Sequence, residues 1–294
     1  MKAFENSSPL SQIIYLFIFC LAGLFLAGSL VTVINGLWGG QLMHSAWGLR
    51  VSSAFQMVLM FFLPAITLVT WSGHKPATFL ELNRSNNSPV LYLLAFIILL
   101  VGMPLISLLL EINQMLVLPE WLSGVELWMQ NLEQSAQATT SLLLDGTSVW
   151  DFLGNILFIG VFAAVAEEVF FRGVLQKLLV KLFKNKHIGV WMAAFIFSLM
   201  HMQFYGFLPR IILGVVLGYL FVYSKNLWIP IFVHFLNNAL VVTFNFFFSD
   251  NSLYQYLENL PVSSTFLVAG LVSLGLLIYL FWLFQSKTCK QVDS

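Results

Sequence analysis

Residues 90–112 read VLYLLAFIILLVGMPLISLLLEI and contain a single charged side chain, Glu111. An apolar run of about 20 residues is long enough to cross the hydrocarbon core of a bilayer as a helix. In lipid, every backbone polar group must find its partner within the segment, so a spanning run of this kind is helical. The stretch therefore predicts a membrane-spanning helix and indicates the class of the whole chain.

Comparable apolar runs recur along the chain. They cover residues 12–34, 52–71, 90–112, 150–171, 189–202, 210–223, 228–248 and 265–284. The fifth and sixth runs are short, and we expect them to be tilted or partly enclosed by neighbouring helices. The sequence predicts an all-α membrane protein, a polytopic bundle of about eight transmembrane helices.

The composition favours the same class. Of the 294 residues, 59% are hydrophobic and 9% are charged, whereas an average soluble domain has about 25% charged residues. So few ionised groups cannot cover a water-soluble surface, and the high hydrophobicity excludes intrinsic disorder. The net charge is zero, so we expect no nucleic-acid partner. Cys20 and Cys289 lie too far apart to indicate a disulfide framework or a zinc site.

The basic residues predict the orientation of the bundle. With eight spans, one side receives Lys2, Lys75, Arg84, Lys177, Lys181, Lys184, Lys186, Lys225, Lys287 and Lys290. The other side receives Arg50 and Arg210, and its loops carry Glu120, Glu126, Glu133, Asp145, Asp250 and Glu258. The positive-inside rule then places both termini in the cytoplasm. We expect a multi-pass protein of a cell membrane, namely the bacterial cytoplasmic membrane.

The long segment 113–149 contains apolar residues at helical spacing. They are Trp121, Leu122, Val125, Trp128, Met129 and Leu132, interleaved with Glu126, Gln130 and Glu133. This pattern is typical of an amphipathic helix lying in the outer membrane interface. A soluble loop folded over the outer face is the alternative. Thr147 or Ser148 is expected to cap the fourth span.

The fourth span carries the charges that most need an explanation, in the stretch Ala166-Glu167-Glu168-Val169-Phe170-Phe171-Arg172. A carboxylate at the bilayer centre costs about 2.5–3.5 kcal/mol on insertion scales. The span could instead end before Glu167, but the helical pattern continues beyond it through Lys177 and Lys181. Glu168 and Arg172 are four residues apart and predict a helical ion pair. Glu167 is rotated by about 100° from Glu168, so it is expected to stay free and to be available as a general base.

Two later spans add histidines, in Phe197-Ser198-Leu199-Met200-His201 and in His234-Phe235-Leu236-Asn237-Asn238. His234 and Asn238 share one helix face, although Asn237 could take the place of Asn238. A carboxylate beside histidine can deprotonate water, and imidazole and amide N–H groups can stabilise an oxyanion. This combination hydrolyses amide bonds, but Glu and His could equally hold a metal ion. Neither G-x-S-x-G nor H-E-x-x-H occurs, so the chain lacks those two signatures.

Three motifs follow one another in order: E-E-x-x-x-R (Glu167, Glu168, Arg172), F-x-x-x-H (Phe197, His201) and H-x-x-x-N (His234, Asn238). Between the last two lie Gly214 to Gly218 and the stretch Leu227-Trp228-Ile229-Pro230. Residues 149–243 thereby resemble the CAAX protease and bacteriocin-processing family. That family includes the type II CAAX prenyl endopeptidases and their bacterial Abi relatives.

The resemblance implies an eight-helix intramembrane protease that uses a glutamate. Glu167 would activate water with the help of His201, and His234 with Asn238 would form the oxyanion hole. Glu168 and Arg172 would support the site. No cofactor is expected, with a divalent metal at the Glu/His cluster as the alternative. The implied partners are the lipid bilayer and a membrane-embedded or membrane-associated peptide or protein substrate.

The chain is expected to form one structural domain in three parts. These are residues 1–148, with variable N-terminal transmembrane helices and the outer amphipathic segment, residues 149–248 as the catalytic core, and residues 249–294 as the last transmembrane helix and a cytoplasmic tail. A non-catalytic bacteriocin-immunity or scaffold protein could bind a peptide in the same groove. A transporter with a buried Glu/Arg/His relay is less favoured, because the sequence shows no inverted repeat. Gly214 and Gly218 are expected to allow close helix packing.

Overall fold

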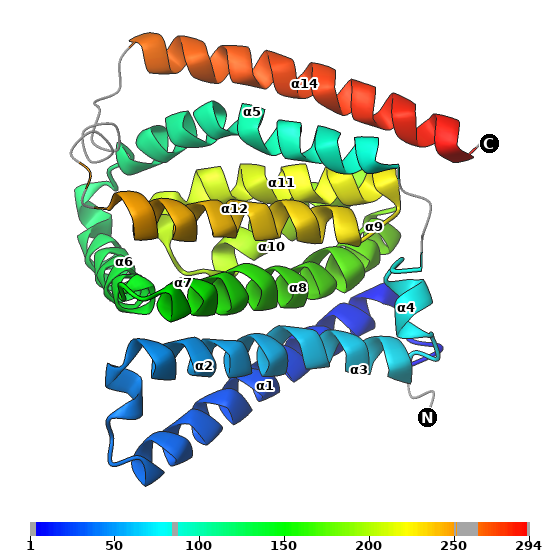
Figure 1. Ribbon diagram of the computed structural model, residues 1–294. Coiled ribbons are helices and arrows are strands. Elements are labelled where there is room, and N and C mark those ends of the chain that lie inside the picture. Colours follow the sequence, from blue (N-terminus) through cyan, green and yellow to red (C-terminus); the bar gives the residue numbers. More distant parts are fainter. Residues whose placement is uncertain (1–3, 84–87, 250, 252–263, 293–294) are drawn as a thin grey trace.

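The computed structural model describes residues 4–83, 88–249, 251 and 264–292, and all regular elements in these ranges are helices (Figure 1). Among the described residues, seven helices are long and apolar enough to cross a membrane, and Lys186–Met200 is a shorter apolar helix. Together they match the eight spans expected. The protein is therefore a polytopic helical bundle, as the sequence predicted.

The longer helices alternate in direction through the bundle. They are α1 (Pro9–Leu37), α2 (Ala46–Met57) continued by η2 (Val58–Phe62) and α3 (Leu63–Trp71), α5 (Pro89–Gln114), the fourth span, α10 (Lys186–Met200), α11 (Phe207–Ser224), α12 (Trp228–Phe248) and α14 (Ser264–Val292). The start of α1, the short α4 (Pro76–Phe79) and the end of α14 lie at one end of the bundle (Figure 1). The helix α6 (Ser123–Leu144) lies at the other end. Which compartment each end faces stays a prediction, and Lys2, Arg84, Asp250 and Glu258 lie outside the described residues.

The fourth span runs from Val149 to Phe183 without a break. It consists of α7 (Val149–Asn155), the π-helical η4 (Ile156–Phe162), α8 (Ala163–Glu168), the π-helical η5 (Val169–Gln176) and α9 (Lys177–Phe183). Ser148 caps it in a capping box with Asp151, which satisfies amides at the helix start. Glu167 and Glu168 therefore lie inside a long helix, and the alternative that the span ends before them is wrong.

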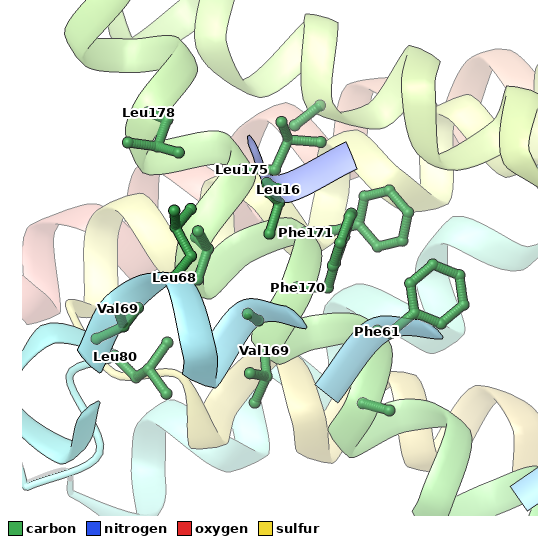
Figure 2. Packing of buried hydrophobic residues seen from close by; sticks show 14 of the residues in the cluster. Leu16, Phe61, Leu68, Val69, Leu80, Val169, Phe170, Phe171, Leu175 and Leu178 are labelled. Carbon is green, nitrogen blue, oxygen red and sulfur yellow. The ribbon is translucent and has the colours of Figure 1, made fainter. Parts of the chain in front are cut away.

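One face of this span packs against the N-terminal helices. Phe61 of η2 lies 5.2 Å from Phe170 and 5.7 Å from Phe171, measured between ring centroids. Leu16 and Leu68 join the same buried cluster (Figure 2). Close apolar packing of this kind stabilises helix contacts within a membrane. The N-terminal helices thus hold the helix that carries the charged residues.

The helices α10 and α11 approach each other closely at Gly214. A Cβ atom added to Gly214 would lie 2.9 Å from the Cβ atom of Ala194, and one added to Gly218 would lie 2.8 Å from Val190. Small residues permit such contact between membrane helices. The expected packing role of both glycines is confirmed.

The segment between the third and fourth spans is helical, as the amphipathic pattern predicted. A 3-10 turn, η3 (Glu120–Leu122), precedes α6, and none of the described residues of α6 is buried. Its place in a membrane interface and the alternative of a soluble segment folded over the outer face both stay predictions.

Candidate active site

The charged residues of the fourth span form a buried ion pair. Arg172 Nη1 lies 2.6 Å from Glu168 Oε1, and the two side chains are 1% and 0% exposed. Arg172 Nη2 donates to the carbonyl oxygen of Gly214 on α11 at 3.1 Å. The guanidinium also lies 4.8 Å from the centre of the Phe197 ring. The predicted pair is present, and it fixes the fourth span to α10 and α11.

His234, on α12, lies between the two carboxylates. Its Nδ1 is 2.8 Å from Glu168 Oε1, and its Nε2 is 3.8 Å from Glu167 Oε2. Because Glu168 Oε1 also accepts from Arg172, we assign the hydrogen to Nδ1 of His234. The two glutamates are rotated apart on their helix, yet the imidazole of His234 lies within 4 Å of both carboxylates.

Glu167 keeps a free carboxylate oxygen. The residue is 5% exposed, and among the described residues its buried Oε2 finds no hydrogen-bond partner. A buried polar atom without a partner is rare in native proteins and needs an explanation. His234 Nε2 lies 3.8 Å from this oxygen, which is beyond hydrogen-bond distance.

His201 follows directly after α10 and is oriented by its own helix. Its Nδ1 lies 2.8 Å from the carbonyl oxygen of Phe197. Since a carbonyl only accepts, Nδ1 carries the hydrogen and Nε2 remains an acceptor. The Phe197 ring lies 4.7 Å from the His201 ring and 6.1 Å from the His234 ring, measured between ring centroids. The two histidines therefore pack against one aromatic side chain.

Asn238 is held by a backbone carbonyl. Its Nδ2 donates to the oxygen of Ile159 at 3.0 Å, and Asn237 Nδ2 donates to Asn238 Oδ1 at 3.2 Å. Ile159 belongs to the π-helical η4. An amide nitrogen carries two hydrogens, so one remains for another acceptor. Asn237 thus contacts Asn238, and the choice between the two amides stays a prediction.

Arg210 was not among the expected site residues. Its two Nη atoms donate to the carbonyl oxygen and to Oε1 of Gln203, at 3.0 and 2.9 Å. Gln203 comes two residues after His201, beyond Met202 with its positive φ of 54°. Arg210 therefore stabilises the turn that runs from His201 to Gln203. An arginine inside an apolar span was the available signal, because such residues are costly there.

The charged cluster does not match a metal site. Within the described ranges, no group of three or more His, Cys, Asp or Glu residues is arranged to hold a metal ion. Glu168 is already bound to Arg172 and His234. The residues as they lie therefore do not fit a divalent cation.

Two apolar pockets, called the apolar hollows below, flank the helical turn that precedes Glu167. One, of about 230 Å³, reaches Ala166 and is lined also by Val58 and Phe62. The other, of about 360 Å³, lies between the fourth span and α12, at Trp228, Ile231, Phe232 and Phe235. Both touch Val161 and Val165. An apolar ligand could approach the polar cluster along either.

The sequence of this core matches a known family. Residues 149–240 fit the family described as type II CAAX prenyl endopeptidase Rce1-like. This segment resembles a CAAX protease family. All six expected site residues fall within the match. With seven apolar helices of spanning length among the described residues, the Rce1-like core suggests a multi-pass membrane protease.

One curated relative matches part of the chain. The chain is 33% identical over 89 residues to "Uncharacterized protein YpbD" of Bacillus subtilis (strain 168). The alignment covers 29% of this chain and 42% of that protein, so the chain spans about two fifths of the length of the relative. No solved structure matches the chain.

Proposed function

We propose that this protein is an intramembrane endopeptidase in which Glu167 activates a water molecule. The observation that carries the proposal is the free Oε2 of Glu167, buried and 3.8 Å from Nε2 of His234. The Glu167 carboxylate thus lies beside the His234 imidazole and is otherwise enclosed by the helices of the bundle. Such a position suits a general base that takes a proton from water.

The reaction needs only the substrate and water. Glu167 accepts one proton as the water oxygen bonds to the carbonyl carbon of the scissile peptide, which gives a tetrahedral oxyanion. The proton then passes to the peptide nitrogen, and the C–N bond breaks. The products are a carboxylic acid and an amine, and Glu167 is again a carboxylate.

The oxyanion would be met by donors from α12. When doubly protonated, His234 donates Nδ1–H to Glu168 and keeps Nε2–H for the oxyanion. The ionised Glu168, fixed by Arg172, stabilises that cation. Asn238 would add its second amide hydrogen, since the first is bound to Ile159. His201, with Nε2 as an acceptor, would orient the water beside Glu167.

The substrate would be a membrane-associated peptide or protein. The two apolar hollows at Val161 and Val165 are suited to a hydrophobic segment or to a lipid attached to the peptide. The name of the matched family points to prenylated C-terminal sequences. A peptide that ends in a prenylated CAAX sequence is therefore the first probe to use.

The test uses purified full-length protein in liposomes with an internally quenched, prenylated CAAX peptide. We expect Glu167→Gln to lower the cleavage rate at least about 100-fold, because general-base catalysis contributes that much. Glu120→Gln, in the 3-10 turn η3, is the matched control and should cleave like wild type. Equal cleavage by Glu167→Gln and wild type would show that Glu167 is not the base.

A second arm separates the alternatives. If the peptide resists cleavage, membrane peptides from cells with wild-type protein are compared with those from Glu167→Gln cells. Identical termini in both would favour the non-catalytic immunity or scaffold protein. Exhaustive chelation with measurement of bound metal tests the metal alternative, and we expect full activity to remain.

A further inference from the structure

A polar cavity lies away from the glutamate site, at the end of the bundle where α4 is located. Its volume is about 260 Å³. Four lysines line it, and they are Lys177, Lys181, Lys186 and Lys225. Glu81 and Gln176 complete the polar lining, while Val180, Phe221 and Val222 form its apolar wall.

The positive charge in this lysine pocket exceeds the negative charge. Lys177 pairs with Glu81 at 3.0 Å, and its ammonium also lies 5.1 Å from the Phe221 ring. In the part of the chain that the structure describes, Lys181, Lys186 and Lys225 form no ion pair, although Lys186 lies 5.7 Å from the Tyr223 ring. An anion would relieve the mutual repulsion of these ammonium groups.

The uncharged polar side chain of the lysine pocket is fixed in its wall. Gln176 is 2% exposed, and its Nε2 donates to the carbonyl oxygen of Gly218 on α11. The polar groups that remain for a ligand are therefore mainly the lysine ammonium groups, so the lining suits an anion.

The lysine pocket is built where helices turn at one end of the bundle. Lys181 and Lys186 flank the turn from α9 to α10, and Lys225 ends α11 in a left-handed conformation, with φ of 53°. Ile188 and Trp191 follow Lys186 along α10 and are exposed. Lysines at the end of spanning helices reach the headgroup level of a bilayer. The exposed apolar side chains beside them would meet acyl chains.

We propose that the lysine pocket binds the headgroup of an anionic phospholipid. The phosphate would contact the ammonium groups of Lys181 and Lys225. Basic pockets between membrane helices are suited to such headgroups, and the proposal is independent of the peptidase.

The test uses the full-length protein in a non-ionic detergent and four probes. They are dioctanoyl phosphatidylglycerol, dioctanoyl phosphatidylcholine, dioctanoyl phosphatidic acid and inorganic phosphate. Binding is followed by native mass spectrometry, with thermal melting as a second readout. We expect phosphatidylglycerol to bind at least about tenfold more tightly than phosphatidylcholine, since each lysine near an anionic headgroup contributes about 1 kcal/mol. Phosphatidic acid should bind at least as tightly as phosphatidylglycerol, because its phosphate carries the negative charge that the lysines meet.

The variant Lys181→Gln with Lys225→Asn should lower the affinity for phosphatidylglycerol about 20-fold. Asparagine is used at 225 because it tolerates the left-handed conformation. The matched control is Lys184→Asn with Lys287→Gln. It removes the same charge and places asparagine at Lys184, which is also left-handed, but neither residue lines the pocket. Three results would overturn the proposal: equal losses of affinity in both double variants, equal binding of phosphatidylglycerol and phosphatidylcholine, or displacement of the lipid by inorganic phosphate.

Discussion

Two neighbouring glutamates of one helix differ in what they contact. Glu168 is fully buried and bound to Arg172 and His234, whereas Glu167 keeps one oxygen without a partner in the described structure. A buried ion pair is weak support for stability, because desolvation offsets the attraction. The pair is better explained by its effect on His234. It orients the imidazole so that Nδ1 bonds Glu168 and Nε2 faces Glu167.

Asn238 gives the sharpest test at this scale. We expect Asn238→Ala to lower kcat about 100-fold or more with little change in KM, the usual cost of losing an oxyanion donor. Asn237→Ala is the matched control, because Asn237 only donates to the Asn238 oxygen. It should lose about tenfold at most. Steady-state kinetics in liposomes measure both, and equal losses would count against a direct role of Asn238.

The helix that carries the site is not a regular α-helix. The short α8 contains both glutamates and lies between the π-helical η4 and η5. Arg172 belongs to η5, and the carbonyl that binds Asn238 belongs to η4. Segments of π-helix occur often at functional sites. Here they supply backbone positions that a regular helix would not offer.

The close approach of α10 and α11 can be tested at Gly214. In Gly214→Ala the new methyl would lie 2.9 Å from Cβ and 3.1 Å from Cα of Ala194, so backbone must shift. We expect a loss of about 1–3 kcal/mol in stability, the cost of overpacking. Activity should fall too, because Gly214 binds Arg172.

The control for that prediction is Gly275→Ala in α14, where an added Cβ meets nothing within 4 Å. It should leave stability unchanged or raise it by up to about 1 kcal/mol, since alanine favours a helix. Melting in detergent compares the two. A Gly214→Ala protein as stable as Gly275→Ala would show that the contact is not tight.

The sequence predicted the helices and their contacts well where these depend on the type and spacing of side chains. Apolar runs located the spans, and the spacing of Glu168 and Arg172 indicated their ion pair. The π-helical segments were missed because hydrophobic periodicity does not encode the hydrogen-bond pattern of the backbone. For the same reason the carbonyls of Gly214 and Ile159 could not be foreseen as partners. Arg210 was missed since its partner Gln203 belongs to no motif.

Across the whole molecule, the N-terminal helices are joined to the fourth span by one buried cation. Arg50 of α2 is 0% exposed and pairs with Asp151 of α7 at 2.7 Å. It also donates to Asn155 Oδ1 and to the carbonyl oxygens of Leu143 and Asp145. The end of α6, α2 and α7 thus meet at one side chain. The division of residues 1–148 from a catalytic core stays a prediction, but the two parts share this junction.

The junction can be tested by removing the charge of Asp151 alone. Asp151→Asn leaves Arg50 buried without its carboxylate, and breaking a buried pair by one partner is strongly destabilising. We expect a loss of about 2–4 kcal/mol in stability in detergent, with little change in the cleavage rate of the folded protein, since the site lies elsewhere. Ser148→Ala is the control, because it removes the hydroxyl that bonds the amide and the carboxylate of Asp151 but leaves the charge of Asp151 in place, and it should cost about 1 kcal/mol. If Asp151→Asn melts no lower than Ser148→Ala, the charge at Arg50 does not hold the two parts together.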